Sequence, residues 1–496
     1  MEIIKSFYNS LDLNKLYSLF LYNPQEPLIF SSAAFLILFT LFLIFHRIFY
    51  KSNKLRIIYI TLFSIYFYYK SSGYFFFLII FTTVIDYLVA FRIYNTEIAY
   101  KRKFYLLVSL VCNLSILAYF KYTNFFIDTY NSLLNGNLQF YDIFLPAGIS
   151  FYTFQSLSYS IDVYRKEIKP LTSYIDYLFC ISFFPQLVAG PIIRTSVMIP
   201  QLEKEYYINK SDFGQAVYLI MAGLFKKVVI ADFLSVNFVD RIFAEPLRYS
   251  GVENLFSVYA YAIQIYCDFS GYSDMAIGLA LLLGIKLPVN FDSPYQSISL
   301  TEFWRRWHIS LSSWLRDYLY IPLGGNRKGK LNTYKNLIIT MLLGGLWHGA
   351  NWKFVLWGFI HGFWLAIEKL FNLPKFYEKN PFTRFIGWLI TFHIVCFCWI
   401  FFRANDFQHA IMMLYQISHG INLENLRMFP EVYNTILLVM LIGYALHYIT
   451  KDIEDLFKLA FTELTFSLQI AYVLVILFIV LQFKTSDIQP FIYFQF

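Results

Sequence analysis

Residues 336–370, NLIITMLLGGLWHGANWKFVLWGFIHGFWLAIEKL, contain two apolar runs with a short polar break at Asn351. Runs of this kind are long enough to enter or cross the roughly 30 Å hydrocarbon core of a membrane as helices. They recur along the whole chain of 496 residues, of which 58% are hydrophobic and only 15% are charged. A soluble domain carries about a quarter charged residues. The sequence therefore predicts an all-α polytopic membrane protein.

The predicted helices are apolar runs that cover most of the chain. They lie at 29–46, 56–69, 74–92, 104–120, 142–162, 174–190, 213–235, 254–285, 336–350, 352–370, 384–402, 433–450 and 466–483. Several are shorter than the ~20 residues of a straight span, which indicates re-entrant elements, and 254–285 is expected to form two pieces. The pattern predicts roughly ten to twelve crossings. No internal repeat, linker, cleavable signal peptide or soluble domain is evident, so residues 1–496 are predicted to form one membrane domain.

The net charge of +8 is distributed in a way that indicates membrane topology. Basic residues cluster in three loops: Arg47, Lys51, Lys54 and Arg56; Arg92, Lys101, Arg102 and Lys103; Arg165, Lys166 and Lys169. The positive-inside rule places these loops in the cytoplasm and the N-terminus outside. Because the basic residues form no contiguous face, a nucleic-acid role is not expected. The five cysteines lie in or beside apolar segments without CxxC spacing, which indicates buried thiols.

His348 is the first candidate catalytic residue. It lies inside or at the end of an apolar run, and Gly344, Gly345 and Gly349 stand on both sides of it. Glycines let another backbone or a ligand approach closely, and the reference pKa of histidine, ~6.5, suits a residue that takes up a proton. The alternative is a core histidine bonded to backbone at a helix break. His308, forty positions upstream, is the second candidate, in an orienting or donor-binding role.

The segment around His308 reads WRRWHISLSSWLRDYLYIPLGGN from Trp304 to Asn326. Its aromatic residues recur at helical spacing with charged residues between them, which predicts an amphipathic helix in the headgroup zone, ended at Pro322. Anchoring at the membrane interface is one role for such a helix. The other is a basic cytoplasmic mouth for a phosphate-bearing donor, because guanidinium groups bind phosphate bidentately. The candidate donor-binding residues are Arg305, Arg306, Trp307, Arg316 and Asn351.

Motifs of other enzyme classes are missing from the sequence. There is no HExxH, no GxSxG elbow and no Walker GxxxxGK[ST], and GYSDM at 271–275 lacks the second glycine of an elbow. No carboxylate or thiol stands at ligand spacing from His308 and His348, so a metal site is not favoured. No bound cofactor is expected.

Several ordered stretches resemble the membrane-bound O-acyltransferase superfamily. They are FWRRWHISLSSWLRDYLYIPLGGNR and LGGLWHGANWKFVLWGFIHG, together with LPAGISFYTFQSLSYSIDVYR (145–165), FFPQLVAGPIIR (183–194) and YCDFSGYSDMAIGLALLLGI (266–285). The likeness is strongest over 145–400 and is closest to the bacterial branch that O-acetylates extracytoplasmic polysaccharides such as alginate and peptidoglycan. It implies a helical bundle around a tunnel in a thinned membrane, with His348 as the essential histidine and His308 as the second.

The resemblance also implies a reaction. Acetyl-CoA would be the donor on the cytoplasmic side of a bacterial inner membrane, and the acetyl group would cross the bilayer to a glycan outside. Since the chain has no soluble hydrolase-like domain, an extracytoplasmic partner of the SGNH-hydrolase type is expected to acetylate the glycan. Two alternatives stay open: a secondary transporter, which would be expected to show inverted repeats, and an acyltransferase of the same fold that acts on a lipid or a protein.

The C-terminal tail, 488–496, ends in QPFIYFQF. Four aromatic residues stand near the end of the chain, where polar and frayed sequence is usual. One interpretation is an aromatic anchor at the membrane interface. The other is that the tail folds into the extracytoplasmic opening and presents Tyr493 as a carrier of the acetyl group. The tail resembles the F-x-Y-F motif of the small peptide of teichoic-acid D-alanylation, and a phenol ester is activated because the reference pKa of tyrosine is only ~10.

Overall fold

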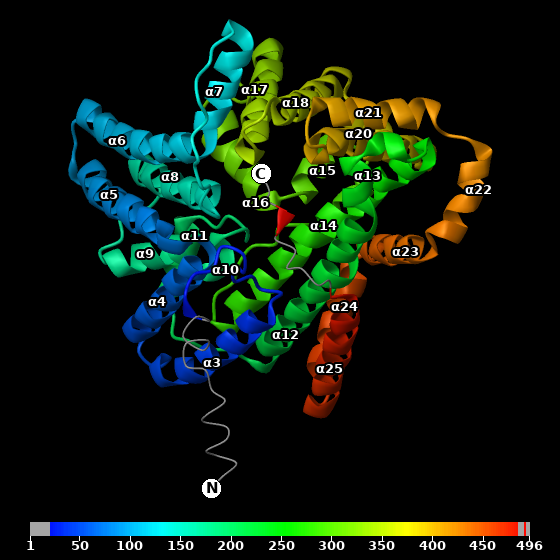
Figure 1. Cartoon of the computed structure of the whole chain (residues 1–496). Coiled ribbons are helices and arrows are strands. Elements are labelled where there is room, and N and C mark those ends of the chain that lie inside the picture. Colours follow the sequence, from blue (N-terminus) through cyan, green and yellow to red (C-terminus); the bar gives the residue numbers. More distant parts are fainter. Residues whose placement is uncertain (1–19, 485–490, 493–496) are drawn as a thin grey trace. The chain divides into compact units, whose positions relative to one another are not determined.

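The computed structural model describes residues 20–484 and 491–492, in which every regular element is a helix (Figure 1). These residues form two compact units. The first contains the chain up to Phe120 together with Tyr141–Val188 and Arg194–Tyr206, and the second contains Lys121–Phe140, Ala189–Ile193 and the chain from Tyr207 onward. The all-α architecture predicted from the sequence is confirmed for the described residues.

Most helices of the first unit follow the predicted apolar runs. They are α3 (Ala33–Phe49), α4 (Asn53–Ser72), η1 (Gly73–Phe75), α5 (Phe76–Asn95), α6 (Ala99–Leu117), α8 (Ile149–Arg165), α9 (Tyr174–Ser182), α10 (Phe184–Leu187) and α11 (Thr195–Leu202). However, α8 begins at Ile149 instead of 142, and α11 was not predicted. The predicted run 174–190 is divided between α9 and α10, because the backbone leaves the helical conformation at Phe183 (φ −52°, ψ 109°).

The second unit holds the larger set of elements. After η2 (Ala118–Tyr122), which crosses the unit boundary, they are α7 (Thr123–Leu134), α12 (Lys210–Phe225), η3 (Lys226–Asp232), η4 (Ser235–Val239), α13 (Asp240–Ala244), η5 (Pro246–Arg248), α14 (Gly251–Leu282), η6 (Pro294–Gln296), α15 (Leu300–Arg306), α16 (Ile309–Leu315), η7 (Arg316–Tyr320), α17 (Lys330–His348), α18 (Trp352–Phe371), α19 (Leu373–Tyr377), α20 (Pro381–Arg403), α21 (Phe407–His419), α22 (Leu423–Val432), α23 (Asn434–Tyr448), α24 (Lys451–Glu463) and α25 (Phe466–Phe483).

A buried carboxylate joins three helices of the first unit. Asp86 of α5 accepts hydrogen bonds from Ser109 Oγ (2.6 Å) and Asn113 Nδ2 (3.0 Å) of α6. Ser109 Oγ also bonds Ser160 Oγ of α8 at 2.8 Å. All four residues are buried. Since a buried carboxylate is costly without partners, this cluster ties α5, α6 and α8 together in one register.

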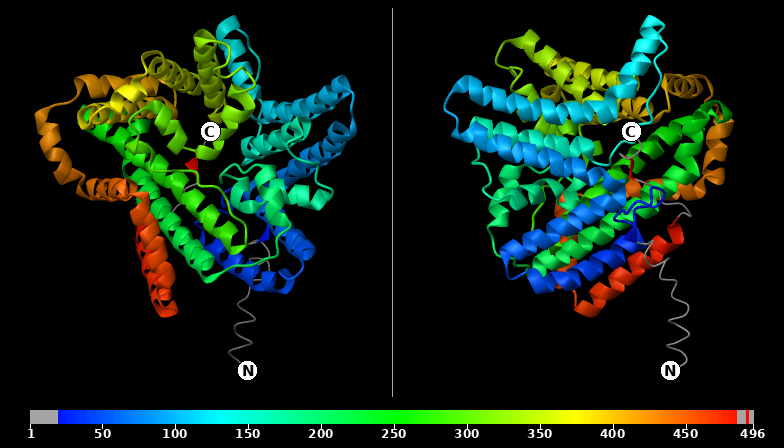
Figure 2. Two further views of the ribbon diagram at one scale, coloured as in Figure 1. Left: turned by 180° about the vertical axis from the view of Figure 1, so that it is seen from behind. Right: turned by 60° about the vertical axis from the view of Figure 1, so that its left-hand side comes forward.

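The long helix α14 is the central element of the second unit and lies beside α12, as both views of Figure 2 show. Its start is fixed by a capping box between Ser250 and Glu253. The expectation of two pieces over 254–285 is wrong, because α14 is continuous for 32 residues. A Cβ at Gly271 would lie 2.7 Å from the carbonyl oxygen of Gly223 on α12. Glycine at Gly271 therefore permits direct backbone contact instead of breaking the helix.

Five helical stretches of the described chain are long and apolar enough to cross a membrane, judged by length and composition: Asn53–Asn95, Ala99–Leu134, Trp352–Phe371, Pro381–Arg403 and Phe466–Phe483. The bent pair α22 and α23 would make a sixth. Other predicted spans are shorter or more polar: α3 and α8 have 17 residues each, and α8 also carries Gln155, Ser156 and Asp162. The protein is a multi-pass membrane protein, and ten to twelve crossings stay a prediction.

Candidate functional site

His348 ends α17, where that helix packs against α18. Close packing of the two helices depends on glycine: a Cβ at Gly345 would collide with the carbonyl oxygen of Phe354, and one at Gly349 would collide with the Phe354 ring. The sequence suggested that these glycines admit either another backbone or a ligand. The structure shows another backbone, that of α18. His348 is 4% exposed, and its ring lies 5.0 Å from that of Trp357.

The carbonyl groups at the end of α17 are bound by two residues from η2, far away in the sequence. Lys121 Nζ donates to the carbonyl oxygens of Trp347 (2.5 Å) and His348 (3.2 Å). Tyr122 Oη donates to the carbonyl oxygen of Leu346 at 2.8 Å. The last carbonyls of a helix lack intrahelical partners, and a cation there also interacts favourably with the helix dipole. Lys121 and Tyr122 therefore hold the last turn of α17, and with it the backbone of His348.

His308 lies at a break between two short helices, α15 and α16. It has the left-handed backbone conformation, with φ +43°, which is uncommon for residues other than glycine. The prediction of a single amphipathic helix through this segment is therefore wrong. The break turns His308 inward, and the residue is fully buried at 0% exposure, with its ring 4.6 Å from that of Phe269 in α14.

The hydrogen bonds around His308 define the tautomer of its neutral ring. Asn290 Oδ1 accepts from the backbone N–H of Ser310 at 3.2 Å, which identifies that atom as the oxygen of the amide. His308 Nδ1 lies 3.2 Å from the same oxygen and must therefore donate to it. The proton is on Nδ1, and the lone pair of the ring is on Nε2. Asn290 thus prepares Nε2 of His308 to accept a hydrogen bond or a proton.

The two predicted histidines come together around one tryptophan. The Trp347 ring lies 6.1 Å from the His308 ring and 5.1 Å from the His348 ring. A third histidine, His361, accepts a hydrogen bond from Trp304 Nε1 at 3.3 Å and packs on Trp357, 4.5 Å away. Across the described residues, no group of three or more His, Cys, Asp or Glu side chains is placed to hold a metal ion. The arrangement is suited to proton transfer in a largely aromatic environment.

The candidate donor-binding residues occupy different environments. Arg305 is exposed, while Arg306 forms an ion pair with Glu302 at 2.9 Å. Arg316 is 63% exposed and pairs with the adjacent Asp317. Their role as donor-binding residues stays a prediction.

The other two donor-binding candidates have structural contacts. Trp307 is 1% exposed and packs between the rings of Phe303 (5.6 Å) and Trp399 (5.2 Å). Asn351 is the N-cap of α18, and its Oδ1 accepts from the backbone N–H of Lys353 at 3.0 Å. These contacts account for both side chains without a ligand, and whether they also touch a donor stays a prediction.

The described part of the C-terminal tail, Phe491 and Ile492, is buried against α14. The Phe491 ring lies 5.4 Å from Phe269 and 4.9 Å from Tyr272. The backbone N–H of Ile492 donates to Asp268 Oδ2 at 2.9 Å. Figure 1 draws these two residues in red beside α14. Phe269 is thus in contact with both the tail and His308. Tyr493, the predicted acetyl carrier, lies outside the described residues.

Sequence reasoning missed the residues that hold the tail, the end of α17 and the ring of His308 in place. Lys227 and Asp268 are ionisable residues inside predicted membrane spans, and such residues are functional candidates by default. This signal could have identified them. Lys121 stands just after a predicted span, and nothing near it in the sequence indicates a contact with α17. Nothing near Asn290 in the sequence indicates its contact with His308 either.

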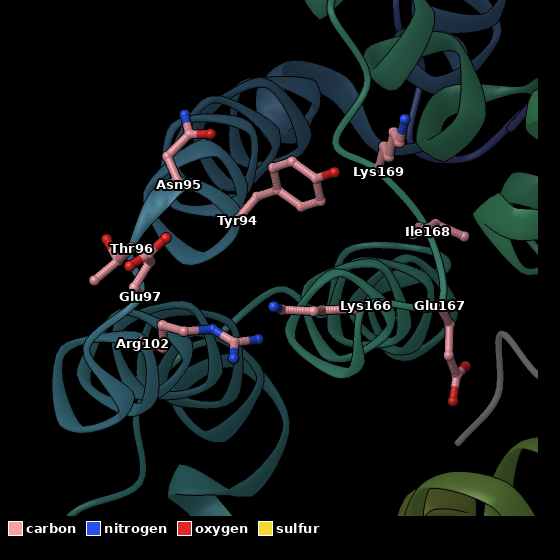
Figure 3. Close-up of a pocket in the computed structure, with 9 residues that line it drawn as sticks. All are labelled: Tyr94, Asn95, Thr96, Glu97, Arg102, Lys166, Glu167, Ile168 and Lys169. Carbon is pink, nitrogen blue, oxygen red and sulfur yellow. The ribbon is translucent and has the colours of Figure 1, made fainter.

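A separate cavity of about 730 Å³ lies in the first unit. It is lined by Tyr94, Asn95, Thr96, Glu97, Arg102, Lys166, Glu167, Ile168 and Lys169 (Figure 3). Figure 3 shows Lys166, just after α8, extending toward Arg102 of α6. The cavity brings together residues of two loops that the charge pattern places on the same side of the membrane. It contains none of the predicted catalytic or donor-binding residues.

Comparison with known proteins gives the family. Residues 99–407 match the family model of the membrane-bound O-acyltransferases. The chain belongs to this family. It is 37% identical over 385 residues to the peptidoglycan O-acetyltransferase of Helicobacter pylori, with 72% of each chain covered. It is 42% identical over 399 residues to the probable alginate O-acetylase AlgI of Pseudomonas aeruginosa, covering 78% of this chain and 74% of the relative.

A more distant relative is the teichoic acid D-alanyltransferase of Streptococcus thermophilus, 32% identical over 290 residues, which are 52% of this chain and 69% of the relative. The family and its named members confirm the predicted class of enzyme: the protein is a membrane O-acyltransferase. The segments of α15, α16 and α17 that hold His308 and His348 all lie within the matched range.

Proposed function

We propose that the protein takes an acetyl group from cytoplasmic acetyl-CoA and passes it across a bacterial inner membrane by way of Tyr493. An extracytoplasmic partner of the SGNH-hydrolase type then transfers the group to hydroxyls of a cell-wall or exopolysaccharide glycan. The similarity to proteins named for peptidoglycan and alginate O-acetylation supports this acceptor class. The observation that supports Tyr493 is the burial of the two residues that precede it. Phe491 packs on Phe269, the ring that His308 also contacts, and Ile492 bonds the adjacent Asp268.

The chemistry consists of two transfers that involve Tyr493 and a third on the partner, in which a glycan hydroxyl attacks the acetyl-serine ester and regenerates the serine. The phenolic oxygen of Tyr493 attacks the thioester carbonyl, the carbon–sulfur bond breaks, and CoA leaves as a thiol with the proton that Tyr493 gave up. His348 accepts that proton from the phenol and returns it to the sulfur. The acetyl-tyrosine ester is then attacked by a serine hydroxyl of the partner, which regenerates the phenol. Because CoA is released on the cytoplasmic side when the carbon–sulfur bond breaks, only the acetyl group crosses the membrane.

The test uses the full-length protein in sealed proteoliposomes with acetyl-CoA labelled in the acetyl group. Wild-type protein is expected to release free CoA and to yield a C-terminal peptide heavier by one acetyl group. Tyr493→Phe keeps the ring and removes the nucleophile, so the labelled peptide and glycan acetylation in cells should both be lost. Full glycan acetylation by Tyr493→Phe would refute the carrier. Passage of label without any release of CoA would support a transporter, and label in lipid would support a lipid acyltransferase.

A further inference from the structure

Two carboxylates share one ammonium group beneath the C-terminal tail. Lys227 Nζ lies 2.5 Å from Asp268 Oδ1 and 2.7 Å from Asp232 Oδ1. All three side chains are buried. Lys227 and Asp232 stand five residues apart in the π-helix η3, whose i→i+5 hydrogen bonding brings them to one face. Asp268 comes from α14, so the cluster joins the two elements.

The two carboxylates differ in their contact with the tail. Asp268 uses Oδ1 for Lys227 and Oδ2 for the backbone N–H of Ile492, at 2.9 Å. Hydrogen bonds from a backbone amide to an ionised carboxylate are among the stronger ones in proteins. Because the donor is a backbone group, this bond sets the position of the chain at Ile492 rather than the identity of its side chain. The next residue along the chain is Tyr493.

The apolar contacts of the tail fix its position along the chain less strictly than the hydrogen bond of Ile492 does. Phe491 packs on Phe269 and Tyr272, and ring contacts of this kind tolerate small shifts along the chain. A shift of one residue at Phe491 would carry every residue that follows it, including Tyr493, along by the same step. A directional bond to one amide removes that freedom, whereas a buried ion pair that served only to join η3 and α14 would have no need for the second oxygen of Asp268.

We propose that Asp268, held by Lys227 and Asp232, is a positioning residue that fixes the register of the C-terminal tail and thereby presents Tyr493 to the active site. The proposal concerning Tyr493 rests on the function proposed above. The fixing of the tail at Ile492 does not, since it concerns binding of the tail alone. The cluster and the ring contacts of Phe491 together form the tail-binding site.

Two pairs of matched variants test the site in the full-length protein. Asp268→Asn removes the negative charge and replaces one of the two oxygens by an NH₂ group, which cannot accept from Lys227 or from the N–H of Ile492, while Asp232→Asn weakens the same ion cluster away from the tail. Ile492→Pro removes the N–H donor without altering any charged residue, and Ile492→Val keeps it. Because Ile492 belongs to the tail, Ile492→Pro leaves Lys227, Asp232 and Asp268 unchanged and separates loss of the tail contact from misfolding of the cluster.

The first readout is protection of the tail from carboxypeptidase, followed by mass spectrometry of the C-terminus. Asp268→Asn and Ile492→Pro are expected to speed removal of the tail by at least about tenfold, as for the loss of a hydrogen bond to a charged group. Ile492→Val should stay near wild type. Asp232→Asn loosens Lys227 but keeps both oxygens of Asp268, so its effect should fall between those of wild type and Asp268→Asn. Equal protection in all four variants would overturn the proposal, and so would loss of protection in Asp232→Asn but not in Asp268→Asn.

The second readout is acetylation of the tail peptide and of the glycan. Asp268→Asn and Ile492→Pro should lower both by about the same factor, with the apparent KM for acetyl-CoA unchanged because neither residue is among the candidate donor-binding residues. If Tyr493→Phe is fully active while tail protection still depends on Asp268, the proposed carrier fails and the tail-binding site stands. If acetylation needs Tyr493 while tail protection is indifferent to Asp268, the carrier stands and the positioning role is wrong.

Discussion

Lys121→Met tests whether the last turn of α17 must be held for catalysis. Methionine keeps most of the length of the side chain and removes the ammonium group that bonds the carbonyl oxygens of Trp347 and His348. The hydrogen bonds of an ionised donor contribute about 1.5–3 kcal/mol each. Interaction of a cation with the helix dipole adds about 0.3–1 kcal/mol.

The loss affects the reaction through the position of His348. If the loss of only one of these two bonds, about 1.5–3 kcal/mol, falls on the orientation needed for proton transfer, the rate drops by about 13- to 160-fold, since each 1.36 kcal/mol is tenfold in rate. Tyr122→Phe removes one neutral hydrogen bond, to Leu346. Such a bond contributes about 0.5–1.5 kcal/mol, so its effect should be smaller, about 2- to 13-fold.

The assay is release of CoA from acetyl-CoA by purified variants in nanodiscs, with kcat and KM measured separately. Lys121→Met should lower kcat and leave KM near wild type, and Lys121→Arg should recover part of the rate because it restores the charge. Lys103→Met, at an exposed position of α6, is the control for loss of a lysine. A kcat within twofold of wild type for Lys121→Met, in protein that elutes as folded enzyme, would refute the positioning role.

Three further predictions concern the site and the packing around it. His348→Ala should lower CoA release by about 10²–10⁴-fold, as expected for loss of a general base. Membrane insertion should be unchanged, and near wild-type glycan acetylation in cells would exclude His348 as the base. Arg305→Ala and Arg306→Ala together should raise the KM for acetyl-CoA and make donor binding less sensitive to salt, and an unchanged affinity would reduce both residues to surface charges. Gly345→Leu should destabilise the folded protein by at least about 1–3 kcal/mol through overpacking, seen as a lower midpoint of thermal unfolding, and unaltered unfolding would contradict the close contact of α17 with α18.

Local sequence patterns were sufficient for most of the helices and for selecting two candidate histidines, whose catalytic role stays a prediction. Apolar runs depend only on composition along the chain, and they located α4, α5, α18 and α25 to within a few residues. His348 could be found because polar residues inside such runs are rare and costly. The same local rules misplaced the helix around His308, where periodic aromatic residues suggested continuity and the backbone is broken at φ +43°.

By itself, then, the sequence determined the class of protein, its helical segments and which histidines to suspect, because hydropathy and spacing act between near neighbours. Only the tertiary structure decided what holds those residues in place. Lys121 meets the carbonyl of His348 across 227 positions, and Asp268 meets Ile492 across 224. No local pattern encodes such pairs. A buried donor or acceptor must find a partner, and which partner it finds depends on how distant helices pack.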